Sequence, residues 1–382
     1  MMIRTEQLGE LIQGAEEIEP TAKGLRPHRL PAWVRAQFPD PQLLLVEAQP
    51  SGVRLAMNTE ARAIELKIHS TRVGYLGMER ARGAVDVLVD GGFHDRGILE
   101  AGDLIEVDLE NGSSGFRPGA SQLIRFETLP EGRKQVEIWL PHNESVELIE
   151  LLADAPLART ADHRPVWLHH GSSISHGSNA AGPSEIWPAI AAHAGGVALH
   201  NLGFGGSALL DPFMARVMRD RPADLISLKL GINVVNLDGM RLRTFGPAVH
   251  GFLDTVRDGH PETPLLLISS VLCPIHEDTP GPGAFDPRSL GTGTVSFIAT
   301  GDPAEVAYGK LNLKVIRREL AAIVEQRADP NLHYLDGTVL YGEADSAAHP
   351  LPDALHPDTR THRIIGERFA DFAFGPGGPF KA

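Results

Sequence analysis

The fold can be predicted outward from residues 166–177, which read Val166-Trp167-Leu168-His169-His170-Gly171-Ser172-Ser173-Ile174-Ser175-His176-Gly177. The bulky apolar run between Pro165 and Leu168 is short, and it favours a buried β-strand. Gly171 ends that run, and Pro183-Ser184-Glu185 is typical of the start of a helix. Side chains that follow the carboxyl end of a parallel strand lie where open α/β sheets bind ligands. The serines of this stretch are therefore candidate functional residues.

Ser173 is the candidate nucleophile, and a motif near the C-terminus supplies the groups that a serine needs. A serine hydroxyl is protonated at neutral pH, so it requires a base within hydrogen-bond reach and a third group that orients the base. Asp353 precedes His356 by three residues, and this spacing lets both side chains lie on one side of a turn. The carboxylate can then hold one imidazole nitrogen while the other faces Ser173.

Two glycine-containing segments between these motifs carry candidate oxyanion donors. Residues 201–207, Asn-Leu-Gly-Phe-Gly-Gly-Ser, end an apolar strand in glycines, whose N–H groups can approach a ligand closely. Residues 228–233, Leu-Lys-Leu-Gly-Ile-Asn, end another strand in an amide side chain. The N–H groups of Ser173 and Gly206 with the Asn233 amide would form an oxyanion hole, where one donor is typically worth roughly 3–4 kcal/mol in the transition state.

Each candidate also has a purely structural explanation. Ser173 alone fits an ordinary turn, and Ser172 and Ser175 are alternative nucleophiles. Gly206 fits a role in turn geometry, and Asn233 fits a cap of the segment that follows it. An Asp-x-x-His pair fits a helix cap as well. The ordered set of all the motifs favours the catalytic interpretation.

In order, residue type and spacing, these motifs resemble those of the GDSL, or SGNH, serine esterases. Residues 171–175, Gly-Ser-Ser-Ile-Ser, stand where that family has Gly-Asp-Ser-Ile-Thr, so the resemblance gives Ser173 the nucleophile's place. It gives the oxyanion and Asp-x-x-His places to Gly206, Asn233, Asp353 and His356. The resemblance covers about residues 165–375 and implies a flavodoxin-like three-layer α/β/α domain with a parallel sheet. Two departures are Ser172 in place of Asp, and Val234 in place of the Asp that commonly follows the family's Asn.

The composition of the chain restricts the classes of protein to which it can belong. The chain has 382 residues, 42% apolar and 22% charged, with a formal net charge of −14. These values fit a soluble globular protein of two domains, and the acidic balance argues against nucleic-acid or anionic-membrane partners. The single cysteine, Cys273, excludes an intrachain disulfide. No apolar run reaches the ~18 residues that span a bilayer, and the N-terminus lacks a signal h-region, so we expect a cytoplasmic location.

Other motifs for catalysis or cofactor binding do not occur in the sequence. A Gly-x-Ser-x-Gly nucleophile elbow is missing, which disfavours the α/β-hydrolase fold. Walker and dinucleotide-binding fingerprints are missing too, so no cofactor is expected. Without a His-Glu-x-x-His motif or a pair of cysteines, we expect no metal site. His169 and His170 adjoin within a strand, so their side chains should face opposite sides of the sheet.

Residues 1–160 are predicted to form an N-terminal all-β domain, a sandwich of the jelly-roll kind, with an irregular lead-in over residues 1–40. Short segments with period-two alternation and turn residues between them carry this prediction. The candidate strands are Leu43–Ala48, Val53–Met57, Ile64–Ser70, Val85–Val89, Leu104–Leu109, Leu123–Thr128, Val136–Leu140 and Val146–Leu152. Such a domain either binds carbohydrate or acts as a scaffold that shapes the catalytic cleft. Its aromatic residues are few and scattered, which favours the scaffold.

Residues 161–382 are predicted to form the SGNH catalytic domain, reached through a connection at residues 155–165. Strands and helices alternate here, which implies a parallel sheet with right-handed crossovers. The predicted strands are Val197–Leu202, Leu225–Leu230, Pro264–Ser270 and Leu332–Leu335, and the helices span residues 211–220, 245–257, 302–327 and 359–372. The long loop at residues 273–301 is either a surface or contact loop or a border of the substrate pocket, with His276 and Glu277 as candidate lining residues.

The predicted function is hydrolysis of an acyl ester through an acyl-serine intermediate. A β-rich domain before an SGNH domain is similar to carbohydrate esterases and to GDSL acyltransferases that tailor aromatic polyketides such as tetracyclines. The alternative is therefore acyl transfer from an ester or thioester to a hydroxyl of a natural product or sugar. A second alternative is a carbohydrate-binding protein with an inactive SGNH domain. The expected partners are a small acyl ester or acyl-thioester with water or an alcohol, a carbohydrate or polyketide among them.

Overall fold

The computed structural model describes residues 2–78, 80–109, 111–289, 292–293 and 295–381. The chain forms two compact units. The first comprises Met1–His163 and Ala181–Glu185, and the second comprises Arg164–Ala180 and Ile186–Ala382. The sequence places a domain boundary between residues 160 and 161; the first unit continues to His163 and takes in the short segment Ala181–Glu185.

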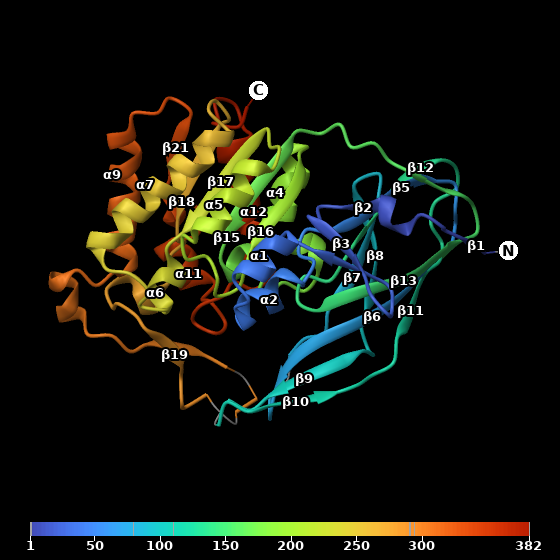
Figure 1. The fold of residues 1–382 in the computed structure, drawn as a ribbon, viewed down its shortest axis with the longest axis horizontal. Coiled ribbons are helices and arrows are strands. Elements are labelled where there is room, and N and C mark those ends of the chain that lie inside the picture. The colour runs from blue at the N-terminus through green and yellow to red at the C-terminus, as the bar shows by residue number, and fades with distance from the viewer. Residues whose placement is uncertain (1, 79, 110, 290–291, 294, 382) are drawn as a thin grey trace. The chain divides into compact units, whose positions relative to one another are not determined.

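Strands dominate the first unit (Figure 1), which confirms the predicted strand-rich N-terminal part. Its elements are β1 (Ile3–Arg4), η1 (Leu8–Leu11), β2 (Ile12–Gln13), β3 (Glu17–Pro20), β4 (Leu25–His28), α1 (Ala32–Gln37), α2 (Pro41–Glu47), β5 (Arg54–Thr59), β6 (Ile64–Tyr75), β7 (Ala84–Val89), β8 (Gly92–Ile98), β9 (Asp103–Val107), β10 (Ser114–Arg117), β11 (Gln122–Phe126), β12 (Lys134–Trp139), β13 (Ser145–Ala153), β14 (Leu157–Arg159) and η2 (Pro183–Glu185).

These strands form two sheets. One has the order β10-β9-β6-β13-β4-β3, with β1 beside β13 and β11 beside β6. The other has the order β14-β5-β12-β7-β8, with β2 beside β5. Along β6, Leu66 and Ile68 are buried while Lys67 between them is exposed. Successive side chains of a strand face opposite ways, so this alternation gives the sheet one apolar face.

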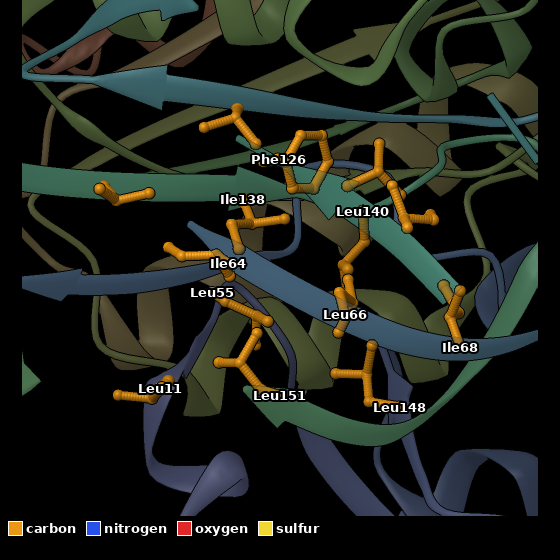
Figure 2. Close-up of a cluster of buried hydrophobic side chains, with 14 of the residues drawn as sticks. Leu11, Leu55, Ile64, Leu66, Ile68, Phe126, Ile138, Leu140, Leu148 and Leu151 are labelled. Atoms are coloured by element: carbon orange, nitrogen blue, oxygen red, sulfur yellow. The ribbon is translucent and has the colours of Figure 1, made fainter. Parts of the chain in front are cut away.

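The apolar faces of both sheets supply one hydrophobic core (Figure 2). Leu55 of β5, Leu66 of β6 and Ile138 of β12 are each fully buried within it. Phe126 of β11 and Leu148 of β13 belong to the same cluster. Removing this apolar area from water is the main favourable contribution to the folding free energy of the unit, because isolated strands bury little apolar surface.

Two predictions near the N-terminus are wrong. The strand predicted at Leu43–Ala48 is helix α2, because the Asp40 carboxylate accepts the Leu43 N–H at 2.8 Å and Pro41 occupies the first turn. Leu43 and Val46 lie three residues apart and are both buried, as on one face of a helix. The lead-in at residues 1–40 is not irregular throughout, since it contributes β1 to β4 to the two sheets.

Strands and helices alternate in the second unit, as predicted. Its elements are β15 (Val166–Gly171), α3 (Ser173–His176), α4 (Trp187–Gly195), β16 (Ala198–Gly203), α5 (Pro212–Asp220), β17 (Leu225–Leu230), α6 (Ile232–Asn236), α7 (Leu242–Gly259), β18 (Leu265–Ser269), α8 (Pro274–Glu277), β19 (Gly283–Phe285), β20 (Phe297–Ala299), η3 (Pro303–Tyr308), α9 (Leu313–Arg327), β21 (Leu332–Leu335), α10 (Gly337–Leu340), α11 (Glu343–Ala348) and α12 (Thr359–Ala373).

The parallel sheet of this unit has the order β16-β15-β17-β18-β21. Numbered along the chain, that order is 2-1-3-4-5, which is the flavodoxin-like order, and the prediction of this fold class is confirmed. The chain moves one way from β15 to β16 and the other way from β17 onward. Open sheets of this kind bind ligands beyond the carboxyl ends of the strands where the order reverses, which here lies between β15 and β17.

Helices cover both faces of the sheet (Figure 1). The ring contacts of two adjacent histidines identify which helices lie on each face. The ring of His169 on β15 contacts Trp187 of α4, with the centroids 4.8 Å apart. The ring of the next residue, His170, stacks on Phe252 of α7 at 6.1 Å. Adjacent strand residues point to opposite faces, so α4 and its neighbour α12 cover one face while α7 and its neighbour α5 cover the other.

One predicted helix is shorter than expected. The sequence predicts a single helix over residues 302–327, but a 3-10 turn at Pro303–Tyr308 ends at Gly309, whose φ is 89°. Helix α9 then starts anew at Leu313, because the Asn312 side chain accepts the Val315 N–H at 2.9 Å. No helix in the described ranges is long and apolar enough to cross a membrane.

A buried lysine lies in the central strand β17, all of whose residues are buried. The side chain of Lys229 is 2% exposed, and its Nζ has no hydrogen-bond partner within the part of the chain that the structure describes. Burial lowers the pKa of Lys229 from 10.5 to about 8. An unpaired buried cation is costly, so we infer that Lys229 reduces the stability of the second unit at neutral pH.

We expect Lys229→Met to stabilise the second unit at pH 7 by about 1–3 kcal/mol, because one pKa unit corresponds to about 1.4 kcal/mol. Below the folded-state pKa the lysine is charged in both states and the full cost applies. Between about 8 and 10.5 only the unfolded chain keeps the proton, so wild-type stability rises with pH and the advantage of the variant shrinks. Urea unfolding at pH 7 and pH 10 measures the difference.

Lys314→Met is the matched control, since the Lys314 side chain is 58% exposed in a surface ion pair. Its effect on stability should be much smaller than that of Lys229→Met at pH 7 and nearly the same at either pH. A Lys229→Met protein that is no more stable than wild type at pH 7, or whose advantage grows with pH, would contradict the inference.

Candidate active site

Ser173 starts the short helix α3 directly after β15 ends at Gly171. Ser172 is the N-cap residue, and its C=O accepts the N–H of Ser175 at 3.0 Å. Gly177 closes the turn with a left-handed φ of 109°, a conformation that suits glycine. The structure therefore places the Ser173 hydroxyl at the carboxyl edge of the sheet, beside the point where the strand order reverses.

Three side chains from two distant segments form one hydrogen-bonded chain. Ser173 Oγ lies 2.9 Å from His356 Nε2, and His356 Nδ1 lies 2.8 Å from Asp353 Oδ2. An ionised carboxylate only accepts, so Nδ1–H donates to Asp353 and Nε2 remains to accept the Ser173 O–H. An imidazole placed in this way can act as a base toward a serine hydroxyl.

Asp353 is fixed by further donors. Its Oδ1 accepts the N–H of Leu355 at 2.9 Å and that of His356 at 2.6 Å, and its Oδ2 accepts from Asn179 Nδ2 at 3.0 Å. Burial alone would raise the pKa of Asp353, but the hydrogen bond and charge of His356 and the backbone N–H groups outweigh it, so the pKa lies below its usual value. The carboxylate is therefore ionised at neutral pH.

Two residues outside the turn that carries Asp353 and His356 donate hydrogen bonds to its backbone. The N–H of Phe297 on β20 donates to the C=O of Asp353 at 2.9 Å. The Cys273 thiol lies 3.6 Å from the C=O of Ala354, to which it donates. Burial raises the pKa of the Cys273 thiol to about 12, so it stays protonated and unreactive. Cys273 thus takes part in the structure of the turn.

The predicted oxyanion donors lie at neighbouring strand ends. The N–H of Ser173 is at the first position of α3, where no intrahelical acceptor exists. Gly206 is exposed in the loop after β16 and has a left-handed φ of 74°. Asn233 of α6 follows β17, and its Oδ1 accepts the N–H of Ala208 at 3.1 Å. That bond ties the Gly206 loop to Asn233 and leaves Nδ2 of Asn233 as a donor.

A buried polar chain lies under α3 and fixes it to the sheet. Trp167 Nε1–H donates to Ser227 Oγ at 2.9 Å, Ser227 Oγ lies 2.7 Å from His169 Nδ1, and His169 Nε2 lies 2.8 Å from Ser175 Oγ. Burial lowers the pKa of His169 well below its usual value, so the ring is neutral. Asn201 Nδ2 also donates to the Ser175 C=O at 2.9 Å. Ser175 is fully buried in this chain, which disfavours it as an alternative nucleophile.

The two departures from the family pattern both concern buried side chains. Ser172 is 1% exposed, and its Oγ has no hydrogen-bond partner among the described residues. Val234 is also 1% exposed and packs as an apolar residue of α6. Neither residue supplies an atom to the hydrogen-bonded chain of Ser173, His356 and Asp353.

The residues predicted to line a pocket in the 273–301 loop are buried, and the loop's residues 290, 291 and 294 lie outside the described part. His276 is 0% exposed, and its Nδ1 lies 3.2 Å from the C=O of Thr279. The Glu277 carboxylate accepts two bonds of 2.9 Å from Arg317 of α9. These contacts anchor α8 to α9, and a role of either residue in binding substrate stays a prediction.

Sequence reasoning missed two residues that touch the site. Asn179, which donates to Asp353, has a left-handed φ of 66°, and a single Asn after Gly-Ser gave no sign of this contact. The Phe297 ring stands edge to face with the His356 ring, with centroids 5.5 Å apart and planes at 77°. Phe297 lies in the irregular loop, where no periodic pattern could have predicted its position.

Solved structures similar to this chain have both of its parts. A salicylyl-acyltransferase, SsfX3, from a tetracycline biosynthetic pathway is 28% identical, with a TM-score of 0.77 over 96% of this chain and 95% of that one. A putative GDSL-like lipase from Bacteroides ovatus is 18% identical, with a TM-score of 0.68 over 97% and 95%. A family two carbohydrate esterase from Cellvibrio japonicus is 14% identical, with a TM-score of 0.55 over 97% and 96%. No curated protein matches the chain.

The model of one protein family matches residues 170–364, a span that begins just before Ser173 and ends after His356. The match covers more than half of the chain and contains the whole hydrogen-bonded chain described above. The protein belongs to the GDSL-like lipase/acylhydrolase family and is an enzyme that acts on ester bonds.

Proposed function

We propose that the protein hydrolyses an acyl ester through a covalent acyl-Ser173 intermediate. The observation that supports this most is the 2.9 Å contact between Ser173 Oγ and His356 Nε2, with Asp353 bonded to the other ring nitrogen. Without that base, a serine hydroxyl is a weak nucleophile.

In the first half of the reaction, His356 Nε2 takes the Ser173 proton as Oγ attacks the ester carbonyl carbon. The carbonyl oxygen becomes an oxyanion, which the N–H groups of Ser173 and Gly206 and the Asn233 amide stabilise. Asp353 stabilises the imidazolium that forms. His356 then gives its proton to the leaving alkoxide oxygen as the C–O bond breaks, and the acyl group stays on Ser173.

In the second half, the same imidazole takes a proton from a second nucleophile that attacks the acyl carbon. The bond from the acyl carbon to Ser173 Oγ then breaks, and His356 gives the proton back to Oγ. Water as the nucleophile gives hydrolysis, and a bound alcohol gives acyl transfer. The hydrogen-bonded chain is the same for both, so the exclusion of water from the site decides between them.

Acyl transfer is the alternative function, and one observation favours it. The neighbour at 28% identity, which matches over 96% of this chain, is named as a salicylyl-acyltransferase. The carbohydrate esterase, at 14% identity, supports the fold but not a sugar substrate. The second alternative, a carbohydrate-binding protein with an inactive catalytic unit, is disfavoured because all the proposed triad and oxyanion positions are occupied by suitable groups.

Ser173→Ala should reduce turnover of p-nitrophenyl acetate to the background rate, because no other hydroxyl bonds to His356 in the described structure. The release of p-nitrophenol is the measurement. Ser172→Ala is the matched control: it removes a hydroxyl from the adjacent residue, which has no hydrogen-bond partner among the described residues, and should keep the wild-type rate. Full activity of Ser173→Ala, or loss in Ser172→Ala alone, would place the nucleophile elsewhere.

Asp353→Asn should lower kcat by about two to four orders of magnitude, because an amide donor facing Nδ1 favours the tautomer with its proton on Nε2. The amide oxygen can still accept the backbone N–H groups of Leu355 and His356, so the fold should persist. Asp358→Asn, at the N-cap of α12, is the control, since Asn caps a helix about as well as Asp. Equal rates for the two variants would exclude the proposed role of Asp353.

Hydrolysis and transfer are separated by supplying a panel of acyl esters and acyl-thioesters with and without acceptor alcohols. If hydrolysis is the function, free acid should form at the same rate whether or not an acceptor is present. Mass spectrometry detects the acid and the new ester, with Ser173→Ala as the blank. A new ester without free acid would replace hydrolysis by transfer.

A further inference from the structure

A two-stranded hairpin in the 273–301 loop carries an aromatic pair. In this hairpin β19 pairs antiparallel with β20, and Phe285 lies directly opposite Phe297. Residues opposite each other in such a pair share one face. Their ring centroids are 5.1 Å apart with planes at 34°, so the two rings form one continuous apolar surface.

One end of this surface lies against the proposed base. The Phe297 ring contacts the His356 ring edge to face, and the Phe297 N–H donates to the Asp353 C=O. The hairpin is therefore fixed to the turn that carries both residues. The same imidazole bonds to Ser173 Oγ at 2.9 Å, so the Phe297 ring lies beside the group that would activate the nucleophile.

The base of the hairpin lies against α6, which carries Asn233. A Cβ atom on Gly281 would lie 1.7 Å from the C=O oxygen of Val235, and one on Gly283 would lie 2.8 Å from Asn236 Oδ1. At Gly281 the approach is between two backbones, and only glycine allows it there. The hairpin thus contacts α6 at one end and the imidazole of His356 at the other.

Both rings of this pair are partly exposed, unlike the rings that stack in the core of the second unit. Trp167 and Phe369 stack at 5.0 Å, and both are fully buried in the core. Phe285 and Phe297 are only half-buried. Half-buried aromatic rings beside reacting groups are typical of the apolar walls of ligand sites.

We propose that Phe285 and Phe297 form an aromatic wall of the substrate site and select esters that carry a flat aromatic ring. This inference rests on the proposed ester hydrolysis at Ser173 and names the substrate class of that site. A planar ring can stack on the wall or meet it edge to face, and a saturated ring of similar size can do neither. The ring belongs to the acyl part or to the alcohol part of the ester. In both cases the wall contacts it in the same way, by stacking or edge to face.

Two matched pairs of substrates test the wall and locate the ring. Ethyl phenylacetate against ethyl cyclohexylacetate changes the acyl side, and benzyl acetate against cyclohexylmethyl acetate changes the alcohol side. The measured quantity is the ratio of kcat/KM for the aromatic ester to that for the saturated ester, followed by pH-stat titration. A ratio removes any general effect of a variant on the rate.

Wild type should prefer the aromatic ester of at least one pair, and Phe285→Leu should lower that ratio about two- to tenfold. Phe297→Leu should lower it by a similar factor, and the absolute rate as well, because Phe297 also touches His356. Phe372→Leu is the control, since Phe372 is a partly exposed residue of α12, and its ratio should equal that of wild type. The pair whose ratio changes identifies the side of the ester that carries the ring.

Ethyl acetate, which has no ring, separates this inference from the proposed function. Turnover of ethyl acetate by wild type but not by Ser173→Ala supports ester hydrolysis at Ser173. If that holds while wild type shows no aromatic preference, or Phe285→Leu keeps the full preference, the aromatic wall is wrong and the proposed function stands. If wild type turns over no ester of the set, both are overturned.

Discussion

The arrangement of the site depends on the reversal of strand order between β15 and β17. Connections leave the sheet in opposite directions at that point, so no crossover helix fills the space beyond the two strand ends. Ser173 follows one of these strands and Asn233 follows the other. Ser173 and Asn233, which are 60 residues apart in sequence, thereby lie at the ends of adjacent strands. The positions of the hydroxyl and the amide donor are set by the sheet, whereas the imidazole and Asp353 lie in a loop.

The sheet also explains why α3 is held so firmly. Gly203 ends β16 opposite Gly171, and a Cβ atom on it would lie 2.5 Å from the N atom of His176. That contact lets the start of α3 pack on the backbone of β16. From the other side, His362 of α12 donates to the Ser178 C=O through Nε2 at 2.9 Å. Burial lowers the pKa of His362 to about 4, so the ring stays neutral and keeps this hydrogen bond over the physiological range.

Regular elements and strand-end residues were predictable from the sequence, and contacts made by loops were not. The apolar run before Gly171 and the glycines after β16 each form a local sequence pattern. Such a pattern predicts where a strand ends, so the positions of these residues at strand ends were predictable. Helix α2 was mistaken for a strand because Leu43, Leu44 and Leu45 form an unbroken apolar run that suits either element, and the Asp40 cap was overlooked. Phe297 meets His356 through a hairpin with no periodicity, and such a contact is fixed by tertiary packing alone.

The charges around the proposed base favour one proton transfer over others. His169 and His362 are buried and neutral, whereas Asp353 is ionised. When His356 takes a proton, the nearest full charge that faces it is the Asp353 carboxylate, and the surrounding low dielectric strengthens that attraction. The charge of the buried Lys229 acts in the same direction, since it adds to burial and to His170 in lowering the pKa of His169. A cation on the same face of the sheet keeps that ring from competing for the proton, so a residue that weakens the fold can still favour the chemistry.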